Sequence, residues 1–169
     1  MRILFIGDIV GEPGRRAIKE LVPKIVKREK IDFVIANGEN TAGGSGITPM
    51  IVDELLGYGV DVITSGDHVW KRKEILDRIA EDARILRPAN YPHEAPGFGA
   101  TVVTSRSGVE VGVINLIGRV FMQAVECPFR TVKCEVEKMK NKTRIIVVDM
   151  HAEATSEKVA LGWFLDGTV

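Results

Sequence analysis

The sequence predicts an α/β fold in which parallel strands alternate with helices. Short continuous runs of Val, Ile and Leu are separated by segments of helical period, a pattern typical of buried strands joined by helical crossovers. Four of these runs end close to an acid or a histidine, and parallel strands bring their carboxyl ends to one edge of a sheet. A length of 169 residues with 45% hydrophobic composition fits a single domain over residues 1–169.

The first half of the chain predicts three strands, each followed by a helix. The expected strands are residues 3–6, 31–36 and 60–63. After a turn at 11–14, residues 15–30 form a helix whose apolar face is Ile18, Leu21, Val22, Ile25 and Val26. Thr48 and Pro49 open the next helix as N-cap and first helical residue, and Gly57 ends it. A short helix around Ile75, Leu76 and Ile79 follows the third strand.

The second half, from residue 84, has a different pattern and is expected to be antiparallel or mixed. A proline-rich loop precedes two β-rich runs, 100–104 and 109–116, and residues 105–108 form a hairpin turn between them. The remaining expected elements are a polar helix at 131–140, a strand at 144–148 and a helix at 155–165 that begins with a cap region, Thr155 to Glu157.

Charge and composition exclude several classes of function. The 23 basic and 23 acidic side chains balance without a block of like charge, so a broad surface for DNA or an anionic membrane is not expected. Cys127 and Cys134 form no metal or redox motif and are expected to be free thiols in a reducing compartment. No apolar run approaches the ~20 residues of a membrane span, and no signal peptide is visible. A cytoplasmic location is therefore expected.

Polar residues at the strand ends form a candidate metal site. Asp8, Glu39, Asn40, Asp67 and His151 offer three carboxylates, an amide oxygen and an imidazole. This mixture of hard and borderline donors suits Fe, Mn or Zn better than Ca or a thiolate-bound metal. Two divalent or trivalent ions that share Glu39 would activate a water molecule and hold a phosphate for in-line attack.

Other polar residues leave alternatives open. His68 suits a proton donor to a leaving alkoxide, or it packs under Trp70 as a structural histidine; the other strand ends favour the donor. Asp149 either orients the ring of His151 or caps the turn. The glycine-rich loop 41–46 lacks the lysine of a P-loop, so a flexible substrate loop fits it at least as well as a phosphate cradle.

Six motifs spread over the whole chain resemble one known family. They are Gly-Asp-Ile-Val-Gly at 7–11, Asn-Gly-Glu-Asn-Thr-Ala-Gly-Gly at 37–44, Thr-Ser-Gly-Asp-His-Val-Trp at 64–70, Arg-Pro-Ala-Asn-Tyr-Pro at 87–92, Asn-Leu-Ile-Gly-Arg at 115–119, and the segment 149–158. In this order they are similar to the bacterial YmdB-like branch of the metallophosphoesterases. The resemblance implies a four-layered α/β/β/α sandwich with a dinuclear metal centre.

The resemblance also implies an activity and a role for each candidate residue. The activity is hydrolysis of 2',3'-cyclic nucleotides at the 2' bond, and some members also act on 3',5'-cyclic nucleotides, so the expected partner is a small cyclic nucleotide or an RNA-derived substrate. Carried over by position, the roles are Asp8 and Asn40 on the first metal, Glu39 as the bridge, Asp67 and His151 on the second metal, and His68 as the proton donor.

Two features depart from the family pattern. Asp67 stands where the family has Asn, which adds a negative charge to the site. The family continues into a strand that supplies one histidine to each metal, whereas this chain ends at Val169, so the final C-terminal strands are expected to be missing. An exposed sheet edge would favour a homo-oligomer. The alternative to a hydrolase is therefore a truncated, catalytically weak or inactive protein of the same fold that binds nucleotide or self-assembles.

Overall fold

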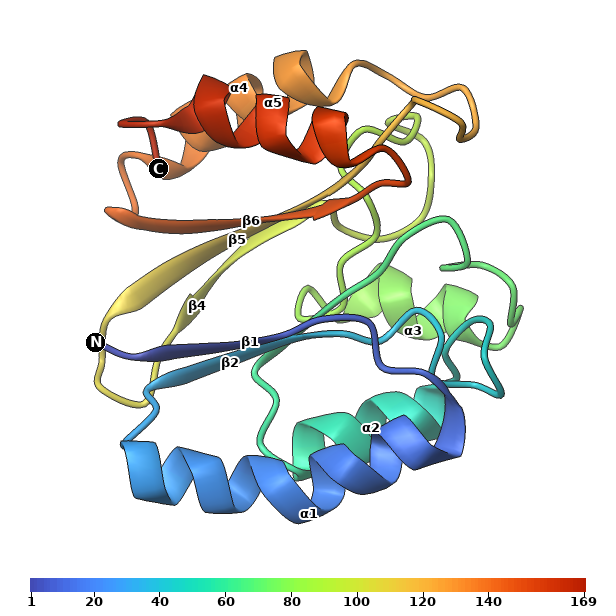
Figure 1. The fold of residues 1–169 in the computed structure, drawn as a ribbon, viewed down its shortest axis with the longest axis vertical. Coiled ribbons are helices and arrows are strands. Elements are labelled where there is room, and N and C mark those ends of the chain that lie inside the picture. Colours follow the sequence, from blue (N-terminus) through green and yellow to red (C-terminus); the bar gives the residue numbers. More distant parts are fainter.

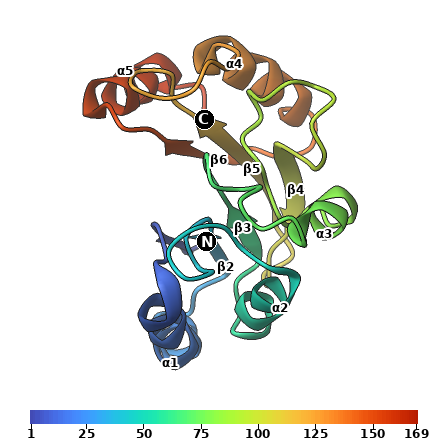
Figure 2. The same ribbon diagram turned by 90° about the vertical axis from the view of Figure 1, so that its right-hand side faces the viewer.

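The computed structural model describes residues 1–169 as two three-stranded sheets packed face to face between helices (Figure 1). The strands are β1 (Ile3–Ile6), β2 (Phe33–Asn37), β3 (Val62–Thr64), β4 (Ala100–Thr104), β5 (Glu110–Ile117) and β6 (Ile145–His151). The helices are α1 (Gly11–Glu29), α2 (Pro49–Gly57), α3 (Ile75–Glu81), α4 (Pro128–Met139) and α5 (Thr155–Leu165). Helices α1 and α2 lie on one side and α4 and α5 on the other (Figure 2), so the expected α/β/β/α sandwich is confirmed.

The strand pairing agrees with the two sequence patterns. In the first sheet, β1 and β3 both pair with β2 in parallel. In the second sheet, β4 and β5 form the expected antiparallel hairpin, closed by a turn in which Gly108 N donates to Ser105 O at 3.0 Å, and β6 runs parallel to β5. Strands β1, β2, β5 and β6 therefore run toward the same side of the molecule, on the right in Figure 1.

Three apolar layers hold the sandwich together, and the middle one leads to the candidate site. Alternate residues of β2 serve two layers: Val34 and Ala36 pack toward the helices, and Phe33 and Ile35 pack between the sheets. The residues buried between the sheets are Phe33, Ile35, Val62, Leu86, Val111 and Val113. Toward the carboxyl ends of the strands, the polar residues Asn37, Thr64, Asn115 and Asp149 bond across this same space. The space between the sheets is thus apolar at one end and polar at the other.

Several element boundaries differ from those expected, for identifiable reasons. The predicted turn at 11–14 is wrong, since α1 begins at Gly11 and places Pro13 in its first turn, where a missing amide removes no helical hydrogen bond. Pro128 lets α4 begin three residues early in the same way. Leu21, expected on the buried face of α1, is 51% exposed. The cap predicted at Thr155 is also wrong, because Ala154 is the N-cap of α5 and no side chain caps it.

None of the helices combines the length and the hydrophobicity that crossing a bilayer requires.

The turn after α3 contains an ion pair with a predicted pH dependence. Arg84 donates to both carboxylate oxygens of Asp82, at 2.9 and 2.7 Å, and these bonds hold the pKa of Asp82 below its ordinary value. A lowered pKa means that this contribution to the free energy of unfolding is complete above about pH 4 and is lost as the pH falls through the folded-state pKa. Asp82→Asn should therefore lower stability at pH 7 and flatten its decline in acid, as measured by urea unfolding. Asp53→Asn, which removes an exposed pair with Arg78, should change little.

Candidate metal centre

The six residues singled out from the sequence come together where the strands end. Asp8 follows β1, Glu39 and Asn40 follow β2, Asp67 and His68 follow β3, and His151 is the last residue of β6. The first three strands belong to one sheet and β6 to the other, so the site lies at the end of the space between the two sheets. Strand β6 continues to His151 because this residue pairs with Ile117 of β5, three residues beyond the predicted end of the strand.

A first group of donors surrounds the carboxylate of Glu39. The ligand atoms of Glu39, Asp67 and His151 all lie within 4.8 Å of one another. His151 Nε2 is 3.1 Å from Asp67 Oδ1 and 3.4 Å from Glu39 Oε1. This is a carboxylate, carboxylate and imidazole set of the kind that binds Mn, Fe or Zn.

The environment of Glu39 is unfavourable for a carboxylate in the absence of a cation. The residue is only 1% exposed, and its Oε2 atom has no hydrogen-bond partner. Burial raises the pKa of Glu39 above its ordinary value; the charges of Asp67 and Asp8 act in the same direction, while His151 and His68 oppose it. A buried carboxylate oxygen without a donor is destabilising. The residues present therefore fit a metal ion, which would balance the charge and engage the free oxygen.

A second group of donors adjoins the first through Asn40. Asn40 Nδ2 donates to Asp8 Oδ2 at 2.8 Å and to Glu39 Oε1 at 3.1 Å. The Asn40 Oδ1 atom lies 2.8 Å from His68 Nδ1, and His68 Nε2 lies 3.6 Å from Asp67 Oδ2. The polar contacts of His68 are thus with the candidate ligands. Trp70, under which His68 was alternatively expected to pack, lies against Tyr91 with a ring separation of 4.7 Å.

The glycine at the end of β3 is required by how closely the chain segments approach. A Cβ atom at Gly66 would lie 2.0 Å from Glu39 Oε2 and 2.5 Å from His151 Cδ2. No side chain has room there. Only glycine at this position lets the segment after β3 lie against Glu39 and His151, which come from different sheets.

Behind the ligands, Asp149 joins the two sheets. Its Oδ2 atom accepts hydrogen bonds from Thr64 Oγ1 at 2.5 Å and from Asn37 Nδ2 at 3.4 Å, and partial burial raises its pKa. The backbone N–H of Glu39 donates to Asn37 Oδ1 at 3.2 Å, so this network also positions the central carboxylate. Both sequence expectations for Asp149 are wrong, since it neither bonds to the ring of His151 nor caps the turn.

Sequence reasoning missed the contribution of Asn37 and Thr64. Both are the last residues of buried strands, and both keep the two-residue period of the apolar side chains that face the other sheet, Phe33 and Val62. A polar residue that interrupts such a period at a strand end is the signal that would have identified them.

The glycine-rich loop is held from outside by two arginines. Arg15 Nη1 donates to Thr41 O at 2.6 Å. Arg72 donates to Ala42 O at 2.8 Å and to Ser45 O at 3.2 Å. These side chains bond to backbone carbonyls in this conformation, so a phosphate would compete with the loop for them. Whether the loop binds substrate stays a prediction.

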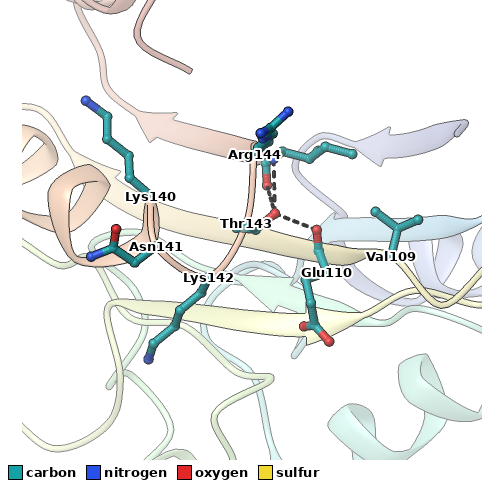
Figure 3. A pocket seen from close by; sticks show the side chains of 8 residues that line it. Val109, Glu110, Lys140, Asn141, Lys142, Thr143 and Arg144 are labelled. Carbon is teal, nitrogen blue, oxygen red and sulfur yellow. Dashed lines mark hydrogen bonds between the residues drawn. The ribbon is translucent and has the colours of Figure 1, made fainter.

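A cavity of about 440 Å³ at the opposite end of the second sheet does not have the features of an active site (Figure 3). Lys140, Lys142 and Arg144 line it, but their side chains extend away from one another (Figure 3). Thr143 Oγ1 donates to Glu110 O at 2.6 Å and so fixes the turn that precedes β6. No charged groups converge there on one point.

Comparisons with known proteins find a matching family model and a curated relative. A family model described as "YmdB-like protein" matches residues 4–169. The chain is 48% identical, over 167 residues, to the 2',3'-cyclic-nucleotide 2'-phosphodiesterase of Bacillus subtilis, covering 99% of this chain and 63% of that protein.

Two solved structures share the fold. One is a hypothetical protein from Thermus thermophilus, with a TM-score of 0.90 and 41% identity over 99% of this chain and 64% of that one. The other is a phosphatase from Mycoplasma pneumoniae, with a TM-score of 0.89 and 31% identity over 99% of this chain and 60% of that one. The chain thus spans somewhat less than two thirds of the length of each of these relatives. The match along residues 4–169, together with the shared sandwich, shows that the chain belongs to the YmdB-like family.

Proposed function

We propose that this chain is a single metallophosphoesterase-like domain that hydrolyses cyclic nucleotides, 2',3'-cyclic ones first and 3',5'-cyclic ones as a second class. One observation carries the proposal: the buried carboxylate of Glu39 lies between two groups of donors and keeps one oxygen without a partner. The activity named for the B. subtilis relative supports the choice of substrate.

The donors divide into two proposed metal sites that share Glu39. Asp8 and Asn40 complete the first, and Asp67 and His151 complete the second. Bound Fe, Mn or Zn would lower the pKa of water and neutralise charge on the phosphate oxygens. The protein's own part is to hold these donors in place through Gly66 and through the hydrogen bonds of Asn37.

His68 is the proposed proton donor to the departing ribose oxygen. Its Nδ1 atom is held by Asn40 Oδ1 at 2.8 Å, and Nε2 is 3.6 Å from the nearest oxygen of Asp67. The side chain is half-buried, so one ring nitrogen is fixed by the protein while the other remains available to a ligand. Imidazole is the side chain best suited to proton transfer near neutral pH.

His68→Ala should lower turnover of a 2',3'-cyclic nucleotide in Mn(II) by roughly 100-fold or more while leaving metal content unchanged. The reason is that the variant removes the proton donor but none of the proposed ligands. Turnover and metal analysis by mass spectrometry test this in parallel. His93→Ala, an exposed histidine in a loop, is the matched control and should behave as wild type. Loss of metal in His68→Ala would make this residue a ligand instead of a donor.

A second candidate function follows from the charge of the site. With Asp67 in place of the family's Asn, the cluster carries the three carboxylates of Asp8, Glu39 and Asp67, which oppose an anionic substrate. The alternative is therefore a catalytically weak or inactive protein that binds nucleotide or assembles into a homo-oligomer. It predicts metal and nucleotide binding without turnover at saturating Mn(II), and light scattering tests the assembly.

A further inference from the structure

An exposed aromatic ring occupies a strained position in the loop after β5. Phe121 is 90% exposed and has a φ of +62°. Met122 N donates to Arg119 O at 3.3 Å, so residues 119–122 form a turn with Phe121 in third place. Glycine or asparagine usually occupies a turn position with positive φ, because a larger side chain is disfavoured there. The ring makes little contact with the protein that could offset this strain.

This loop begins beside the candidate metal centre. Ile117 is paired with His151, and Gly118 N donates to the carbonyl of His151 at 2.8 Å. Further along the loop, Gln123 Nε2 donates to the hydroxyl of Tyr91. Tyr91 packs against Trp70, which is two residues after the proposed proton donor. Phe121 therefore lies four residues after the pairing partner of His151, in a segment bonded at one end to His151 and at the other to Tyr91.

The loop is held in place by a buried carboxylate. Glu157 accepts hydrogen bonds from the backbone N–H of Arg119 at 3.1 Å and of Val120 at 3.3 Å. After the turn, Met122 and Val125 pack against the apolar layer between the first sheet and its helices. Phe121 is thus presented on an immobilised turn, so a ligand that stacks on it would lose little affinity to ordering of the backbone.

We infer that Phe121 stacks on the nucleobase of the substrate while the phosphate lies at the metal centre. This inference rests on the proposed function and names the residue that would favour a nucleotide over other phosphodiesters. Stacking on an aromatic side chain strengthens nucleotide binding by on the order of 10- to 100-fold. The alternative, contact with a protein partner, fits less well. The turn exposes one ring and the partly exposed Val120, far less apolar surface than a stable interface buries.

Phe121→Gly provides a test in which a structural and a binding role give opposite results. Glycine adopts positive φ without strain, so the variant should melt about 2–4 °C higher than wild type. Its KM for a 2',3'-cyclic nucleotide should rise on the order of 10-fold or more. The KM for ethylene glycol cyclic phosphate, which has the same five-membered phosphodiester ring and no base, should stay unchanged. Phe121→Trp should retain the low KM.

Trp163→Ala is the matched control, because it removes another exposed aromatic ring, 78% exposed, from α5. It should leave both KM values unchanged. A lower melting temperature for Phe121→Gly with both KM values raised alike would assign the ring a structural role and overturn the inference. A change in molecular mass by light scattering would assign it to an interface, with the same consequence.

Failure of the proposed function is distinguishable from failure of this inference. If wild type turns over neither substrate, the hydrolase proposal fails, and calorimetric titration with a nucleoside 3'-monophosphate then decides the role of Phe121. Weaker binding to Phe121→Gly than to wild type supports stacking. Equal binding, or no binding to either protein, overturns it.

Discussion

Gly66→Ala is expected to abolish metal binding and turnover together, because the added methyl group has no room beside the candidate ligands. The new Cβ would lie 2.0 Å from Glu39 Oε2 and 2.5 Å from His151 Cδ2, well inside van der Waals contact. One of these side chains, or the end of β3, must move. We expect turnover to fall by more than about 100-fold and the free energy of unfolding to fall by about 1–3 kcal/mol. Metal analysis, turnover and urea unfolding measure the three effects.

Gly7→Ala is the matched control for this variant. Gly7 precedes Asp8 at the end of β1, as Gly66 precedes Asp67 at the end of β3, but a Cβ atom there would meet nothing within 4 Å. It should keep metal and activity. Normal metal content in Gly66→Ala would mean that Glu39 and His151 do not meet at the end of β3 when metal is bound. A similar loss in both variants would show a general sensitivity of the strand ends instead of a steric clash.

The position of Gly66 also shows where sequence reasoning succeeds and where it stops. A glycine after a buried strand predicts a sharp turn and a close approach, and both are present. The strand pattern could not predict that the group close to Gly66 is the ring of His151, because His151 belongs to the other sheet. Strand period and strand ends are local properties of the chain, whereas the pairing of two sheets depends on contacts between distant residues.

The same distinction explains the differences at Leu21 and Asp149. The helical period of α1 is correct, but how much of its apolar stripe is buried depends on contacts with distant segments, and Leu21 is 51% exposed. Asp149 finds its partners, Thr64 and Asn37, across the space between the sheets. The residues of the site were predictable because each follows a recognisable strand; the hydrogen bonds that support them were not.

Glu39→Gln is expected to stabilise the metal-free protein while removing its function. The wild-type carboxylate is 1% exposed, and one of its oxygens has no partner. The amide is neutral and nearly isosteric, so the unfavourable burial of a charge disappears. We expect the free energy of unfolding to rise by about 1–3 kcal/mol at pH 7 in the presence of a chelator. The variant should bind metal at least about 100-fold more weakly, with a comparable loss of turnover.

The pH dependence gives a second, independent measure of the same charge. Burial raises the pKa of Glu39 above its ordinary value of 4.5, so ionisation is disfavoured in the folded state. The stability of the metal-free wild type should therefore fall as the pH rises from about 4.5 through the raised pKa, and Glu39→Gln should lack this fall. The difference between the two proteins should shrink on acidification, when wild type becomes protonated and neutral.

Saturating metal should reverse the order of stability of these two proteins. Each of the two proposed ions, present at 100 times its dissociation constant, stabilises the folded wild type by about 2.7 kcal/mol. The two together exceed the advantage of the variant, which should gain almost nothing from metal. Glu20→Gln, an exposed acid on α1, is the control and should change stability by less than about 0.5 kcal/mol in either condition. If Glu39→Gln is instead the less stable protein in chelator at pH 7, the carboxylate already has the partners it needs. Glu39 would then need no cation between the two groups of donors.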